Sequence, residues 1–159
     1  MSGEPAITVP PLAPRSAARV AAVQALYQMD LAATDLNEVI GEFEAFRFGP
    51  DAEDRTVADA DRDFFRSLIQ GVVRRQREID PMIDRQLAEG WRLTRIDSIL
   101  RAILRVGALE LLERSDVPAR VVITEYVNTA HAFLGGDEPR VVNGVLDKLA
   151  RRQRPTEFT

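Results

Sequence analysis

Two arginines one helical turn apart, Arg15 and Arg19, are the residues whose type and spacing best suit binding chemistry. They fall at the start of a predicted helix, where the helix dipole disfavours cations and where like charges repel each other. Local helix stability therefore does not explain their position. Two interpretations remain open: the arginines are solvated surface charges, or they bind an anionic partner.

Groups suited to catalysis or metal binding are few. The acidic segment 51–63 resembles a metal site in composition, but it lacks the glycine and the spacing of a calcium loop, so we expect a solvated loop. The chain has no cysteine, which excludes disulfides, thiolate metal sites and cysteine nucleophiles. Its one histidine, His131, is predicted on an outward helix face without a nucleophile nearby. We expect neither an enzyme nor a bound metal or cofactor.

Length and composition further limit the class of protein to which this chain can belong. With 159 residues, 45% of them hydrophobic, the chain suits a single domain with its own core. No apolar run approaches the 18 or so residues that span a membrane, and no signal-peptide pattern opens the sequence. We therefore expect a cytoplasmic protein. A net charge of −4 argues mildly against nucleic acid as a partner unless arginines gather on one face.

The elements that must position these residues all have helical periodicity, and no segment has the period of a strand. A proline-rich stretch, 1–14, predicts a flexible amino-terminal arm. Ser16 is a candidate cap for the first helix, and Asp80-Pro81 predicts the start of a fourth. The sequence predicts an all-α protein with about seven helices, at approximately 16–31, 35–48, 61–77, 80–89, 96–113, 118–134 and 138–150.

The helix predicted at 96–113 has the widest apolar arc and should lie at the centre. Gly107 falls within this arc, which predicts the close approach of a neighbouring backbone. Glu110 also falls within it, and a buried carboxylate must find hydrogen-bond donors.

The outward face of this central helix combines charges and leucines. Asp97, Arg101 and Arg105 recur every four residues, and Leu109 and Leu112 project in nearly the same direction. Exposed leucines beside charges indicate a contact surface for a partner. The alternative is that helices from the first half of the chain cover this face.

Three stretches resemble the NusB family of bacterial transcription antitermination factors. They are AVQALYQMDL at 22–31, ILRAILRVGALELLERSDVPARVVITEYVNTA at 99–130, and VVNGVLDKLA at 141–150. The resemblance implies a helical domain over residues 15–155, with subdomains at about 15–78 and 79–155. It also implies binding of boxA-type RNA in ribosomal RNA leaders, together with the ribosomal protein NusE, within an RNA polymerase antitermination complex.

In the family, an arginine-rich start of the first helix and nearby aromatic side chains bind RNA. Carried over residue by residue, the resemblance implies RNA contacts by Arg15, Arg19 and Tyr27. The sequence departs from the family pattern at 16–18, where further arginines are usual, and at Val141, where an aromatic residue is usual. Each missing phosphate contact should weaken RNA binding and lower its salt dependence by roughly one unit of log–log slope. Other candidates that could compensate are Arg140, Arg151 and Arg152.

For the protein partner, the resemblance places candidate contacts at Asp97, Arg101, Glu113 and Asp137. Glu110 matches a family glutamate, but its inward position favours a structural role. Two alternatives to an RNA-binding factor remain. One is a helical adaptor or homodimer with weak or lost RNA binding. The other, a fragment of an RNA methyltransferase, is disfavoured because the chain ends soon after the last helix, without room for a cofactor domain.

Overall fold

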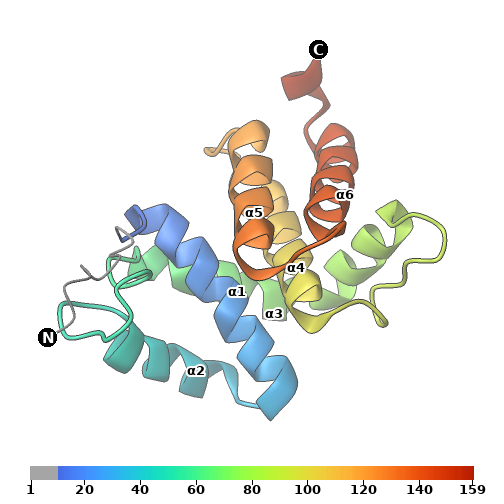
Figure 1. Ribbon diagram of the computed structural model, residues 1–159. Helices are drawn as coiled ribbons and strands as arrows, with labels where there is room; N and C mark the ends of the chain where they lie inside the picture. The colour runs from blue at the N-terminus through green and yellow to red at the C-terminus, as the bar shows by residue number, and fades with distance from the viewer. Residues whose placement is uncertain (1–10) are drawn as a thin grey trace, which may run out of the picture.

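Six α-helices make up the structure, a computed structural model that describes residues 11–159 (Figure 1). The first ten residues of the predicted arm lie outside the described range. No strand occurs in the described part of the chain, which confirms the all-α prediction. The elements in order are α1 (Pro14–Ala32), α2 (Leu36–Glu42), the π-helical turn η1 (Phe43–Arg47), α3 (Arg62–Gln86), α4 (Ser98–Glu113), α5 (Ala119–Phe133), α6 (Glu138–Gln153) and the 3₁₀ turn η2 (Pro155–Phe158).

Helix α4 is the central element, as its wide apolar arc predicts. It packs against α1, α3, α5 and α6, and ten of its sixteen residues are buried. Gly107 faces the side chain of Leu146, whose Cδ1 lies 2.8 Å from the position a Cβ would occupy. The close approach predicted at Gly107 therefore exists, but a leucine side chain makes it rather than a backbone.

Helix α3 joins two predicted helices into one of 25 residues, with Pro81 inside it. A proline in a helix interior removes one backbone hydrogen bond and costs about 3 kcal/mol. Ile79 and Ile83 flank it and are fully buried, so the packing of this turn offsets that cost. The predicted helix start at Asp80-Pro81 was therefore wrong. The predicted subdomain boundary at 78–79 falls inside this helix.

Helix α3 also covers the outward face of α4. Leu109 of α4 is buried against Gly71 of α3. Arg105 binds Asp80 through two hydrogen bonds of 2.9 Å. The interpretation that first-half helices cover this face is confirmed, and it explains why leucines and charges are mixed there.

Helix α1 packs through alanines. Ala18, Ala21, Ala22 and Ala25 have no exposed surface, which lets neighbouring helices approach closely. The helix begins at Pro14 without a side-chain cap, and the hydroxyl of Ser16 donates to Glu125 instead. The cap predicted at Ser16 was therefore wrong. Within the described residues, no helix is long and apolar enough to cross a membrane.

Candidate nucleic-acid interface

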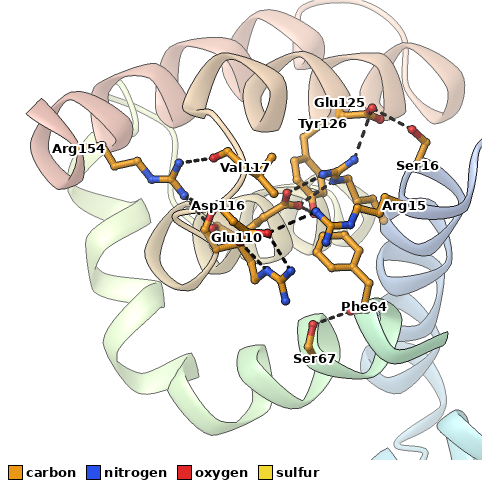
Figure 2. A network of polar contacts seen from close by, with 12 residues as sticks. Arg15, Ser16, Phe64, Ser67, Glu110, Asp116, Val117, Glu125, Tyr126 and Arg154 are labelled. Atoms are coloured by element: carbon orange, nitrogen blue, oxygen red, sulfur yellow. Dashed lines mark hydrogen bonds and ion pairs between the residues drawn. The ribbon is translucent and has the colours of Figure 1, made fainter. Parts of the chain in front are cut away.

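Arg15 lies at the amino-terminal end of α1, close to the protein surface. Its side chain is 45% exposed, and Nη1 lies 3.5 Å from a carboxylate oxygen of Asp116. The guanidinium sits over the ring of Phe64, 4.9 Å from its centroid (Figure 2). Among residues 11–159, Asp116 is the one carboxylate paired with Arg15. An arginine held in this way on an aromatic face retains donors for a phosphate group.

Arg19 lies one turn later, but it is buried. Its guanidinium donates two hydrogen bonds of 2.8 Å to the carboxylate of Glu110, and the hydroxyl of Tyr126 donates a third to the same group. A further carboxylate, that of Glu125, lies 3.4 Å from the guanidinium. Arg19 is only 3% exposed, so the predicted RNA contact at this residue does not fit the geometry. The inward-facing Glu110 required donors, and Arg19 is one of them.

The hydroxyl of Tyr126 is fully buried beside this pair. Burial, followed by the nearby charge of Glu110, raises the pKa of Tyr126 well above its ordinary value of 10. The neutral hydroxyl therefore contributes stability below about pH 10, and that contribution is lost as the pH rises toward the folded-state pKa. We expect the free energy of unfolding to fall between pH 9 and 11 in the wild type. It should fall less steeply in Tyr126→Phe, measured by urea denaturation; equal slopes would contradict the prediction.

The ring of Phe64 is shared by three arginines. The guanidinium of Arg114 lies 5.1 Å from the centroid, as does that of Arg19, and Arg15 lies at 4.9 Å. Arg114 also binds Asp116 through two hydrogen bonds of 3.1 Å. Positively charged side chains from α1 and from the end of α4 thus lie around the ring of Phe64, which comes from α3.

Tyr27 lies twelve residues after Arg15 on α1, which places it about 18 Å farther along the helix. It lines a largely apolar groove of about 520 Å³ with Gln24, Ile99 and Phe133 among its other residues. Aromatic rings and amide groups in a groove of this kind suit the stacking and reading of an unpaired base.

The three candidate arginines of α6 are dispersed. Arg140 lies in the first turn, while Arg151 and Arg152 lie in the last, about 16 Å away. Arg151 is paired with Asp147 at 3.0 Å. In the described chain, no ion pair or shared ring joins these arginines to Arg15.

The candidate partner contacts do not form one patch either. Asp97 caps α4 by accepting hydrogen bonds from the backbone of the first turn, and Glu113 ends the same helix about 24 Å away. Arg101 is 18% exposed and turns inward, where it donates to the carbonyl of Leu93. Asp137 is exposed at the start of α6.

Glu113 is engaged within the molecule. Arg74 donates to both of its oxygens, at 2.7 and 2.6 Å, and Arg75 donates at 3.1 Å. Burial alone would raise the pKa of Glu113, but the hydrogen bonds and charges of the two arginines outweigh burial and lower it. Glu113 is therefore a carboxylate held ionised between two cations.

The comparisons with known proteins decide the family. The sequence profile of the NusB family matches residues 16–151. The chain belongs to the NusB family. It is 56% identical over 145 residues to the transcription antitermination protein NusB of Rhodopseudomonas palustris (strain ATCC BAA-98 / CGA009), covering 91% of this chain and 83% of the relative. The corresponding protein of Maricaulis maris (strain MCS10) is 54% identical over 144 residues, covering 91% and 90%.

Solved structures of NusB proteins share the fold. T. maritima NusB superposes with a TM-score of 0.75 at 28% identity, covering 92% of this chain and 97% of that one. A structure described as antitermination factors NusB and NusE in complex with dsRNA gives a TM-score of 0.69 at 24% identity, covering 86% and 96%. The resemblance to the NusB family expected from the sequence is thus confirmed.

In this NusB-family chain, two structural roles were not predicted from the sequence. Arg114 was not singled out, although it lies within the LERSDVP stretch that carries the resemblance. Arg154 was not singled out either, but it is buried and donates to backbone carbonyls near the end of α4 (Figure 2). Both residues follow helix ends, where unpaired carbonyls and dipole charge favour cations.

The acidic segment 51–63 is a loop that leads into the first residues of α3. Its Asp61 caps that helix by accepting from the backbone amide of Phe64 at 3.0 Å. Among residues 11–159, no group of three or more histidine, aspartate or glutamate side chains is arranged to hold a metal ion.

Proposed function

We propose that this protein is a transcription antitermination factor that binds boxA-type leader RNA together with NusE, within an RNA polymerase complex. Its membership of the NusB family carries this proposal, because relatives more than 50% identical over most of the chain are named transcription antitermination proteins. A solved neighbour of the same fold is described with NusE and dsRNA bound, which supports both partners. The protein acts by binding rather than by chemistry, in the cytoplasm, where bacterial transcripts are made.

The RNA site of this proposal combines a phosphate contact and a stacking surface. Arg15 supplies the accessible charge at the end of α1, and Tyr27 supplies an aromatic ring in the groove farther along the same helix. Unpaired RNA is bound in this way by many proteins, through backbone charges and stacked bases. Arg19 is left out of the proposed contacts because it is buried.

Replacing Arg15 with alanine tests the RNA site. We expect weaker binding of boxA RNA, with a salt dependence reduced by about 0.7 units of log–log slope, because the substitution removes one cation that pairs with a phosphate. Binding should be measured with and without NusE, at two salt concentrations. Circular dichroism should show unchanged helix content, because the side chain lies at the surface.

The matched control is Arg85→Ala, which removes the same charge from an exposed residue at the far end of α3. RNA binding by the control should remain near that of the wild type. Equal affinities of Arg15→Ala, the control and the wild type would remove Arg15 from the RNA site.

The burial of Arg19 favours a second candidate function. It leaves Arg15 as the one accessible arginine of the first turns of α1, fewer than the family pattern implies. A helical adaptor or homodimer that binds NusE but has lost RNA binding would tolerate this change. Binding of NusE without any binding of RNA, under either salt condition, would favour the adaptor; sedimentation would separate it from the homodimer.

A further inference from the structure

A row of arginines continues from the end of α1 across the carboxyl end of α4 to the middle of α3. We call it the basic band and define it by its five arginines: Arg15, Arg114, Arg74, Arg75 and Arg77. We propose that the basic band binds the sugar–phosphate backbone of the same RNA, extending the track that begins at Arg15. This inference rests on the proposed function and adds a contact surface on α3 that the family resemblance did not imply.

Four of the five arginines of the band are linked through shared partners or a shared hollow. Arg15 and Arg114 share the ring of Phe64 and the carboxylate of Asp116. Arg114 is followed along the surface by a shallow hollow of about 200 Å³ between α3 and α4, which Glu113 also lines. Glu113 in turn contacts Arg74 and Arg75 of α3, and Arg77 follows them on the same helix.

Positive charge is in excess along this band, although the whole chain is negative. Its five arginines face three carboxylates, those of Glu78, Glu113 and Asp116. The segment 35–63, by contrast, carries ten carboxylates and three arginines. A polyanion approaching the molecule is therefore repelled from α2 and the acidic loop and attracted toward the band.

Arg74 has donors to spare for a phosphate. Its side chain is 60% exposed, and its bonds to Glu113 use Nη2 alone, so Nε and Nη1 make no hydrogen bond within residues 11–159. Arg77 is exposed and forms no ion pair with a carboxylate of the described chain. Glu113 holds Arg74 and Arg75 in place in the free protein. A phosphate oxygen can replace Glu113 as the acceptor of one of these hydrogen bonds.

The sequence did not indicate that the arginines of α3 form a binding surface, because the predicted helix ended at residue 77. In the helix predicted at 61–77, Arg74 and Arg75 fall in the last turn, where cations stabilise the dipole end. Because α3 continues to Gln86, these arginines lie in mid-helix, where the dipole does not account for them.

The test is the double variant Arg74→Ala/Arg75→Ala in the full chain, titrated with boxA RNA over a range of salt. Removing two cations that pair with phosphates should weaken binding on the order of tenfold at low salt, and should lower the log–log slope by about 1.4 units. The matched control is Arg92→Ala/Arg95→Ala, which removes the same charge from exposed residues of the loop after α3. It should bind nearly as the wild type does.

A second variant, Glu113→Gln, tests the same surface in the opposite direction. It removes the carboxylate that competes with phosphate and should tighten RNA binding severalfold, while thermal denaturation shows that the fold is kept.

The outcomes separate this inference from the proposed function. RNA binding that Arg15→Ala weakens, but Arg74→Ala/Arg75→Ala leaves equal to the control, would overturn the basic band alone. A Glu113→Gln protein with reduced NusE binding and unchanged RNA binding would also overturn it, since the surface would then belong to the protein partner. No RNA binding by the wild type would overturn both proposals.

Discussion

Replacing Glu110 with alanine is expected to destabilise the protein by about 3–5 kcal/mol, the largest effect of any single change considered. The substitution removes the carboxylate that accepts both hydrogen bonds of the buried Arg19 guanidinium and leaves only the more distant Glu125, at 3.4 Å. Removing one partner of a buried ion pair is strongly destabilising. The hydroxyl of Tyr126 loses its acceptor as well. For a chain of this size, the midpoint of thermal unfolding should fall by about 10 °C or more.

The matched control for Glu110→Ala removes both charges together. In Arg19→Met/Glu110→Leu, apolar side chains of similar volume replace the buried pair. The part of the lost stability that comes from the buried charge should return, while the hydroxyl of Tyr126 still lacks its acceptor. Thermal unfolding followed by circular dichroism measures both variants. If Glu110→Ala kept wild-type stability but lost affinity for NusE, Glu110 would be an interface residue rather than the structural partner of Arg19.

Arg154→Ala is expected to cost about 3 kcal/mol. The guanidinium donates to the carbonyls of Leu111 at 2.9 Å and Arg114 at 2.8 Å, and also to those of Glu110 and Val117. These carbonyls lie at and just beyond the end of α4. Those of Glu110 and Arg114 also accept hydrogen bonds from backbone amides, whereas those of Leu111 and Val117 have no backbone donor within residues 11–159. Each buried acceptor left unpaired costs about 1–3 kcal/mol. Urea denaturation should show a lower midpoint.

Arg154→Lys provides the graded control for this residue. An ammonium group keeps the charge but lacks the planar fork that reaches several carbonyls, so the loss of stability should be intermediate. A urea midpoint of Arg154→Ala equal to that of the wild type would mean that water satisfies these carbonyls equally well.

Periodicity was enough to predict most of the fold. The apolar arc of 96–113 correctly predicted that this helix lies at the centre. The position of Glu110 within the arc correctly predicted a buried carboxylate with hydrogen-bond donors. These predictions succeeded because each depends on a single helix and on the cost of burying a charge. The start predicted at Pro81 failed because packing of the isoleucines around the proline outweighs a local signal that usually ends a helix.

The candidate site could be predicted less well, because it depends on how helices meet. Arg15 and Arg19 look equivalent in the sequence, yet one is exposed and the other is bound to Glu110, which lies 91 residues later. The wheel of α1 alone does not say which of its faces α4 and α5 cover. Arg114 comes close to Phe64, and Arg74 to Glu113, only through the packing of α3 on α4.

The continuity of α3 has a consequence for how the molecule comes apart. It packs against α1, and its second half carries Ile79 and Ile83 into the core, so one helix supports both halves of the chain. If one half of the chain opened locally, part of α3 would unfold, and the other half would lose part of the helix that supports it. Amide hydrogens along α3 should therefore exchange at one common, slow rate, rather than in two steps separated near residue 78.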